Sequence, residues 1–299
     1  MRRSCLALYP LLLTAFVAGC GRTTGTTADL LVATTTSTYD SGLLDAILPT
    51  FESSRGVEVD VVAVGTGQAL EFGKSGDVDV VLVHNRDLEE AFVAAGHGVE
   101  RRVVMFNDFV LVGAPEDRAQ VSGAATAAEA FRRIYQTRSI FVSRGDASGT
   151  YARELVLWEQ AGVAPTLTDE WYRPIGQGMG ETLRFADEQA GYTLTDRATF
   201  LAVADSLRGL ALLFGGRSLP ENPDPALLNL YGVIQVTPED PLAPRARLAA
   251  DFVDWLTSLE TQEAIAAYGV ERFGQPLFYP ASDAWCAASE GAAMACADR

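Results

Sequence analysis

Residues 143–150, Ser-Arg-Gly-Asp-Ala-Ser-Gly-Thr, combine side chains that are well suited to hold an anion. Arg144 offers five N–H donors in a fixed fork and does not lose its proton in proteins. Ser148 and Thr150 add hydroxyl donors, and Gly149 lets a ligand approach the backbone closely. The segment therefore predicts a loop that binds an oxyanion through one guanidinium and several hydroxyl or amide groups.

Asp146 gives the same segment a second interpretation. It follows Arg144 by two residues, so its carboxylate can hold the guanidinium in one orientation. Asp146 or Ser148 can equally act as the N-cap of a following helix, which would make the segment a structural capping turn. An Arg-Gly-Asp tripeptide is also an adhesion motif, although nothing else in the chain supports adhesion.

Two more loops carry hydroxyl groups after apolar runs. Residues 34–38 are Thr-Thr-Thr-Ser-Thr and directly follow the apolar residues 30–33. Thr66 lies between two glycines after the alternating run 57–64. Threonines at a strand end are also common structural caps, so each loop alone is ambiguous. Three such loops in one chain favour a binding site.

The first third of the chain predicts strands joined to helices by these loops. Apolar runs and helical spacing give strand 30–33, helix 41–51, strand 57–64, helix 68–74 and strand 78–83. Repetition of strand, loop and helix is typical of a mostly parallel α/β sheet covered by helices.

The pattern repeats further along the chain. Strands are predicted at 109–113, 139–142, 192–194 and 232–236. Helices are predicted at 125–135, 151–161 and 181–188. A further helix begins at Arg197, where Thr195 or Asp196 can cap it, and one long amphipathic helix is predicted at 245–268. Ligands of open α/β sheets bind at the carboxyl ends of the strands, and helix N-termini have unpaired N–H groups. Two such units therefore predict an anion site between two lobes.

The N-terminus predicts export. Arg2 and Arg3 follow the first residue, residues 5–17 are mostly apolar, and small residues precede Cys20. This arrangement is typical of a signal peptide over residues 1–19 with a lipid-bearing Cys20, since the apolar run is too short for a permanent span. Ordinary signal cleavage beside a chance cysteine is the alternative. Residues 20–29 are then expected to be a tether.

The charge excludes several classes of partner. Residues 1–19 contain two arginines and no acids, so their removal changes the formal charge from -16 to -18. A chain this acidic is not expected to bind nucleic acid or an anionic lipid surface. An anion must therefore be held by local donors, because the overall field repels it.

The positions of the cysteines and histidines indicate the redox compartment and whether a metal site is expected. Cys286 and Cys296 lie ten residues apart in the C-terminal tail and predict a disulfide, which fits an oxidising compartment. His84 and His97 are the only histidines and lie far from these cysteines in the sequence. No metal site and no cofactor are expected.

The ordered set of motifs resembles one family. The resemblance is carried by residues 33–38, 64–69, 79–84, 143–150, 176–180, 192–197, 254–256 and 274–278. Together they are similar to the tungstate-binding components of bacterial ABC importers, the Tup-type family. The resemblance implies a type II periplasmic-binding-protein fold, in which a hinge of two crossing strands joins two α/β lobes around an oxyanion. We expect residues 30–109 in lobe I, 110–236 in lobe II, and 237–299 back in lobe I as its C-terminal helix and tail.

The family's ligand positions can be carried over residue by residue. They fall on Thr35, Thr36, Ser37, Thr66, Arg144, Ser148 and Thr150. Segment 143–150 also resembles phosphate-binding relatives, whose receptors present a carboxylate at the strand end that corresponds to His84 here. Phosphate retains a proton at neutral pH, whereas tungstate and molybdate accept hydrogen bonds only, so a carboxylate would repel them. His84 is expected either to donate to the ligand or to pack at the strand end.

The expected function is that of a monomeric, lipid-anchored, extracytoplasmic solute-binding protein. It would capture tungstate or molybdate and deliver it to an ABC permease and its ATPase. A phosphate- or other oxyanion-binding protein of the same fold, and a sensory or adhesion lipoprotein, are the alternatives. An enzyme is not expected, because the sequence contains neither a Gly-x-Ser-x-Gly elbow nor a histidine suited to activate a nucleophile.

Overall fold

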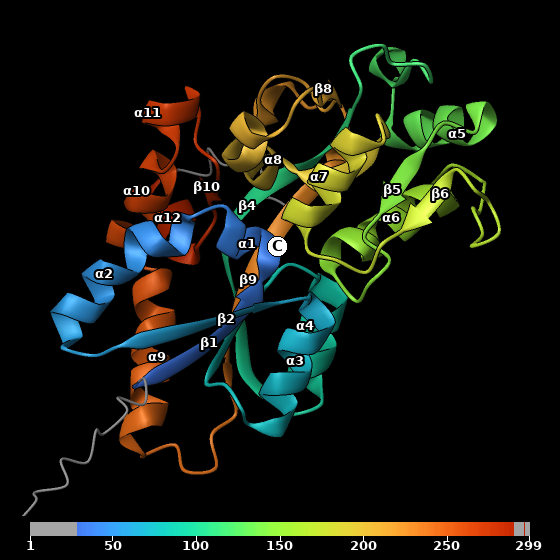
Figure 1. The fold of residues 1–299 in the computed structure, drawn as a ribbon. Coiled ribbons are helices and arrows are strands. Elements are labelled where there is room, and N and C mark those ends of the chain that lie inside the picture. The colour runs from blue at the N-terminus through green and yellow to red at the C-terminus, as the bar shows by residue number, and fades with distance from the viewer. Residues whose placement is uncertain (1–28, 290–295, 297–299) are drawn as a thin grey trace, which may run out of the picture.

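The computed structural model describes residues 29–289 and Cys296. The predicted signal peptide, Cys20 and nearly all of the tether therefore lie outside the described residues. Figure 1 shows two lobes, the first at the lower left and the second at the upper right. Within the described part of the chain, no helix is both long and apolar enough to cross a membrane.

The first lobe is built on a mixed sheet. Its strands, in spatial order, are β10 (Tyr279–Pro280), β4 (Gly98–Gly113), β9 (Leu228–Val236), β3 (Val80–Val83), β1 (Leu30–Thr35) and β2 (Val59–Val64). Strand β1 is parallel to both β2 and β3, whereas β9 is antiparallel to β3 and β4. The carboxyl ends of β1, β2 and β3 therefore lie at one edge, where the hydroxyl-rich segments pass from strand to helix.

Helices cover both faces of this sheet. They are α1 (Thr36–Asp40), α2 (Leu43–Arg55), α3 (Thr66–Ser75), α4 (Arg86–Ala94), α9 (Pro244–Leu256), α10 (Leu259–Ala267), α11 (Val270–Phe273) and α12 (Asp283–Ala288). Leu82 of β3 joins a core with Phe51 of α2 and Phe252 of α9, whereas Val83 joins a second core with Phe92 of α4. Alternate residues of one strand thus face opposite helical layers, which buries both faces of β3.

The second lobe is smaller and contains β5 (Phe141–Ser143), β6 (Tyr172–Pro174), β7 (Thr193–Asp196) and β8 (Ala211–Phe214) with the end of β4. Its helices are α5 (Ala127–Thr137), α6 (Gly149–Gln160), α7 (Met179–Glu188) and α8 (Arg197–Val203), and 3-10 turns occupy Val121–Gly123, Ala204–Ser206, Leu219–Glu221 and Pro225–Leu227. Phe131, Phe141, Trp158 and Trp171 form an aromatic core beneath the loop of residues 143–150. Such a packed base fixes the backbone from which the loop projects.

One strand serves both lobes. Strand β4 pairs with β9 up to Asp108 and with β7 from Phe109 onward. Since β9 pairs along its length with β3 and β4, it belongs to the sheet of the first lobe. The sequence predicts a return to the first lobe only after residue 236, whereas the pairing of β9 places this return near Leu228. The sequence of a single strand does not reveal which sheet the strand joins.

The C-terminal region differs from the sequence prediction at one point. The long helix predicted over residues 245–268 is two helices, α9 and α10, which are separated at Thr257 and Ser258. Ser258 caps α10 by accepting a hydrogen bond from the Thr261 N–H. Cys286 and Cys296 form a disulfide with a Cα–Cα distance of 5.9 Å, which is the pair that the sequence predicts.

Candidate functional site

The N-termini of several helices meet where the two lobes touch. The Gly67 N–H at the start of α3 donates to the Ala147 carbonyl just before α6, at 3.0 Å. Arg144 Nη1 lies 3.4 Å from Thr36 Oγ1, and Gly178, which precedes α7, lies against the same threonine. Helix N-termini carry partial positive charge, so helices α3, α6 and α7 together favour an anion between the lobes.

The first lobe contributes a chain of buried hydroxyl groups. Thr35 caps α1, and its Oγ1 lies 3.0 Å from Ser37 Oγ and 2.7 Å from Thr38 Oγ1. Thr35 and Ser37 are therefore already hydrogen-bonded to one another. Thr66, the first residue of α3, is completely buried, and its hydroxyl has no partner within the described residues.

The second lobe contributes Arg144, whose side chain is only 3% exposed. Asp146 accepts from Arg144 Nη2 at 2.5 Å and from the Ser148 N–H at 3.2 Å. Ser148 caps α6 by accepting from the Tyr151 N–H at 3.1 Å. The two interpretations of this segment are thus compatible, since Ser148 caps the helix while Asp146 orients the guanidinium.

Two unsatisfied donors from opposite lobes mark the interface. Among the described residues, Thr66 Oγ1 and Arg144 Nε are two of the four buried side-chain polar atoms without a hydrogen-bond partner. Thr150 is also buried, and no hydrogen bond of its hydroxyl occurs in the described part of the chain. A buried donor without an acceptor costs about 1–3 kcal/mol. An acceptor ligand that satisfies these groups would recover that cost.

Glu154 supports the loop from below, a role that its sequence position does not reveal. This buried carboxylate accepts from Ser143 Oγ at 2.7 Å, Tyr172 Oη at 2.8 Å and Trp158 Nε1 at 3.1 Å. Ser143 Oγ in turn accepts from the Gly145 N–H, which fixes the turn on either side of Arg144. Burial raises the pKa of the Glu154 carboxyl to about 7. From the sequence alone, Glu154 cannot be distinguished from the other polar residues of an amphipathic helix.

A relay of hydrogen bonds fixes the state of His84. Its Nδ1 lies 2.9 Å from Asn229 Oδ1, Asn229 Nδ2 donates to Asn107 Oδ1 at 2.8 Å, and Asn107 Nδ2 donates to Asp196 Oδ1. Since the Asp196 carboxylate accepts, each amide is oriented and His84 Nδ1 must carry the proton. Burial lowers the pKa of the His84 imidazole to about 4, so Nε2 is unprotonated at neutral pH.

This tautomer bears on the two roles considered for His84. An unprotonated Nε2 is an acceptor, so it does not donate a hydrogen bond to an oxyanion. The ring instead packs against Tyr231 at 4.9 Å between centroids and against Gly149, where a Cβ would lie 2.7 Å from Cε1. The geometry favours packing over ligand donation, and it explains why a residue without a side chain begins α6.

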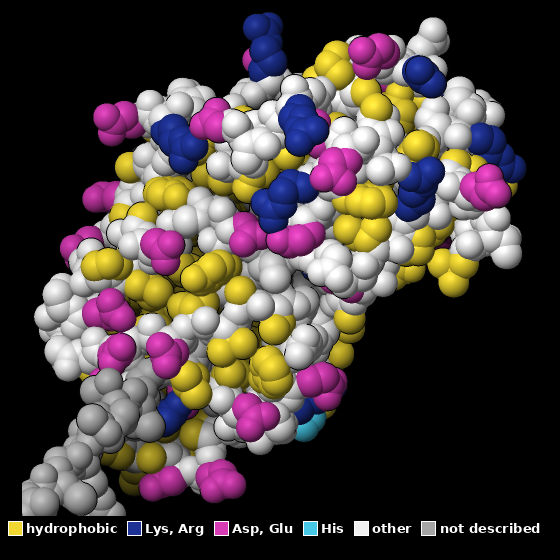
Figure 2. All heavy atoms as spheres, viewed as in Figure 1, with side chains coloured by type: hydrophobic (Ala, Val, Ile, Leu, Met, Phe, Trp, Pro, Cys, Tyr) yellow, Lys and Arg dark blue, Asp and Glu magenta, His cyan; other side chains and the backbone are white. Residues whose placement is uncertain are grey.

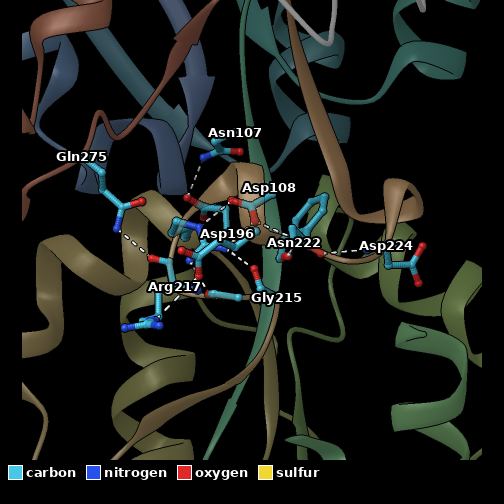
Figure 3. A network of polar contacts seen from close by, with 12 residues as sticks. Asn107, Asp108, Asp196, Gly215, Arg217, Asn222, Asp224 and Gln275 are labelled. Carbon is cyan, nitrogen blue, oxygen red and sulfur yellow. Dashed lines mark hydrogen bonds and ion pairs between the residues drawn. The ribbon is translucent and has the colours of Figure 1, made fainter. Parts of the chain in front are cut away.

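Charged groups reinforce the strands where the lobes join. Arg197 donates to both oxygens of Asp108, at 2.8 and 2.6 Å, and to the carbonyl oxygens of Gly215 and Gly216. Figure 3 shows Asp108 within a network of polar contacts, beside Asn222. Asp196 caps α8 by accepting from the Thr199 N–H, as predicted, and burial raises the pKa of its carboxyl to about 6.

The surface seen in Figure 2 is acidic rather than basic. Figure 2 shows acidic side chains over both lobes, with no continuous basic face in this view. A groove of about 640 Å³ on the second lobe is lined by Leu155, Trp158 and residues 162–167, and its only charged lining residue is Glu159. The contact between the lobes, where Thr66 and Arg144 have unsatisfied donors, is therefore a better anion site than this groove.

Two α/β lobes joined by paired strands, with donors from each lobe meeting between them, define a two-lobed solute-binding protein. A family model described as the PBP superfamily domain matches residues 21–260. The chain belongs to this superfamily, and the predicted type II periplasmic-binding-protein fold class is confirmed.

Individual relatives agree with this assignment. A tungstate-binding protein TupA from Peptoclostridium acidaminophilum is 44% identical over 253 residues, which are 84% of this chain and 85% of the relative. A solved structure of the tungstate ABC transporter from Geobacter sulfurreducens is 47% identical, with a TM-score of 0.71 over 80% of this chain and 98% of that one. The tungstate binding protein TupA from Desulfovibrio alaskensis G20 is 40% identical, with a TM-score of 0.68 over 85% and 99% of the two chains.

Proposed function

We propose that this chain is the solute-binding protein of an ABC importer and captures tungstate or molybdate between its lobes. The observation that carries the proposal is the pair of unsatisfied donors, Thr66 Oγ1 and Arg144 Nε, which come from opposite lobes. The identity of about 40–47% to tungstate-binding relatives supports the choice of ligand. Thr35, Thr36, Ser37, Ser148 and Thr150 are proposed as the further binding residues.

The character of the donors supports a fully deprotonated oxyanion. Arg144, Thr66 and Thr150 can each donate, whereas the nearby Asp146 already accepts from Arg144 and from the Ser148 N–H. A carboxylate that is free to receive a proton would favour a protonated ligand, and Asp146 is not free. A dianion without a proton, such as tungstate or molybdate, needs donors only.

Capture requires the lobes to move relative to each other, because the donors lie in both lobes. Strand β4 exchanges partners between Asp108 and Phe109, and these positions are suited to act as the hinge. An open form would admit the ligand, and contacts such as Gly67 to Ala147 would re-form around it. The closed form would then dock on a permease.

We also propose that the protein acts outside the cytoplasm and is held to a membrane through a lipid on Cys20. The signal-like N-terminus and the Cys286–Cys296 disulfide support this placement, since disulfides persist in oxidising compartments. A monomer suffices, because both halves of the candidate site come from one chain.

Competitive calorimetry tests the ligand directly. Purified protein without its first 19 residues would be titrated with tungstate, molybdate, sulfate and phosphate, and each would be tested for displacement of the others. We expect tungstate or molybdate to bind most tightly and phosphate to bind weakly at pH 7. Preference for phosphate would overturn the ligand assignment while leaving the fold unaffected.

A further inference from the structure

Arg153 is a cation on α6, the helix that begins at the candidate site. It lies one helical turn after Gly149 and three residues after Thr150, so these residues share one side of α6. Its side chain is partly buried. Throughout the described residues, no hydrogen bond or ion pair of its guanidinium is present. The charge of Arg144, in contrast, is matched by Asp146 at 2.5 Å.

The surroundings of Arg153 place it between the lobes. Gly149, on the same side of α6, packs against the His84 ring of the first lobe. The charge of Arg153 contributes to lowering the pKa of His84, as does that of Arg144. The carboxylates that act on Arg153 are those of Asp87 in the first lobe and Asp224 in the second, and neither forms an ion pair with it.

We propose that Arg153 is the second cation of the oxyanion site and supplies the charge that Arg144, neutralised by Asp146, does not. This inference rests on the proposed function. A dianion brings two negative charges into a chain with a formal charge of -16, and helix N-termini provide only partial compensation. An unpaired guanidinium beside the contact between the lobes attracts the approaching dianion and stabilises it once it is bound.

An ion pair with Asp87 that closes the lobes is the competing role. The lobes already touch through Gly67 and Ala147, yet Arg153 and Asp87 do not pair. The two roles predict opposite effects of Asp87→Asn. If Arg153 serves the ligand, removal of the Asp87 charge leaves tungstate affinity unchanged or raises it. If Arg153 serves closure, the same substitution lowers the affinity.

The experiment compares Arg153→Gln with Arg118→Gln as a matched control. Arg118 is exposed on the second lobe, so both variants lose one positive charge from the same lobe. Tungstate affinity would be measured by calorimetry, and association rates by stopped-flow tryptophan fluorescence at low and high salt. Because one charge acts on a dianion through partly screened surroundings, Arg153→Gln is expected to bind tungstate about five- to thirtyfold more weakly at low salt. This loss should shrink at high salt, and Arg153→Lys should restore most of the affinity.

The outcomes separate the inference from the proposed function. Equal affinities of Arg153→Gln and Arg118→Gln, in a series where the wild type binds tungstate, would overturn the role of Arg153 alone. A wild type that binds no oxyanion would overturn both. Thermal unfolding without ligand checks that each variant is folded.

Discussion

The backbone N–H of Gly67 in the first lobe donates a hydrogen bond of 3.0 Å to the carbonyl oxygen of Ala147 in the second. A Cβ on Gly67 would lie 3.0 Å from the Ala147 Cβ and 3.3 Å from that oxygen. The absence of a side chain at residue 67 is therefore what allows the lobes to approach this closely.

Gly67→Val is expected to hold the lobes apart. Overpacking costs about 1–3 kcal/mol in the closed form, which corresponds to a loss of about five- to 150-fold in tungstate affinity. Small-angle scattering should show contraction on tungstate binding for the wild type and less contraction for the variant. Gly209→Ala is the control, since a Cβ there meets nothing within 4 Å. Equal contraction in wild type and Gly67→Val would contradict this account.

Arg144→Ala is expected to weaken tungstate binding strongly. Truncating one partner of a buried charge-assisted pair costs on the order of 2–5 kcal/mol, or roughly 30-fold or more in affinity. Arg144→Lys keeps the charge but loses the fork of donors, so its affinity should be intermediate. Calorimetry at fixed salt provides the measurement. Wild-type affinity in Arg144→Ala would mean that the site lies elsewhere.

Thr66→Val should change stability and affinity in opposite directions. The Thr66 hydroxyl is buried without a partner, so its removal should raise the melting temperature of the ligand-free protein. Loss of one neutral hydrogen bond should cost about 0.5–1.5 kcal/mol of tungstate binding. Thr34→Val is the matched control, because the equally buried Thr34 hydroxyl donates to the Leu82 carbonyl at 2.8 Å. Thr34→Val should lower the melting temperature, and a similar decrease in Thr66→Val would refute the prediction.

Glu154 should make folding stability depend on pH. Burial raises the pKa of its carboxyl from 4.5 to about 7. Between pH 4.5 and 7 the carboxyl is therefore protonated in the folded state and ionised in the unfolded state. The free energy of unfolding falls as pH rises through this window. Relative to Glu154→Gln, the wild type should lose on the order of 3 kcal/mol between pH 4.5 and 7. Denaturant titrations measure this difference, and a constant difference across the window would rule out the proposed titration.

Cys20→Ser should release the protein from membranes. The apolar run and the small residues before Cys20 predict a lipid on its thiol. Fractionation of cells that express each form, followed by immunoblotting, should find the wild type with membranes and the variant in the soluble fraction. If both forms remain with the membranes, Cys20 is not the anchor.

The sequence predicted those features of the fold that depend on local patterns. Asp196 follows a short apolar strand and precedes a helix, which is sufficient to predict the cap that it forms with Thr199. The hydroxyl-bearing residues at 34–38 and 66 lie where β1 and β2 end, and these strands turn out to be parallel, so both groups lie at one edge of the sheet. Local spacing was sufficient in these cases because each element is defined by its own residues.

Features that depend on distant contacts were missed. The first half of β4 contains Glu100, Arg101 and Arg102, whose charges hide a strand that only its pairing with β9 reveals. The break between α9 and α10 at Ser258 interrupts an apolar pattern that continues on both sides. Glu154 differs from other helical glutamates only because Ser143 and Tyr172 reach it from other elements.

Asn107 and Asn229 are register partners on the two strands that connect the lobes, and their side chains are hydrogen-bonded to each other. Residues on the axis of a rotation keep their positions, whereas residues farther from the axis move. If the lobes turn about this part of β4 and β9, the two amides act as a stationary pivot. The proton on His84 would then stay assigned to Nδ1 in the open and closed forms alike, so opening would expose the same chemical surface to every arriving ion.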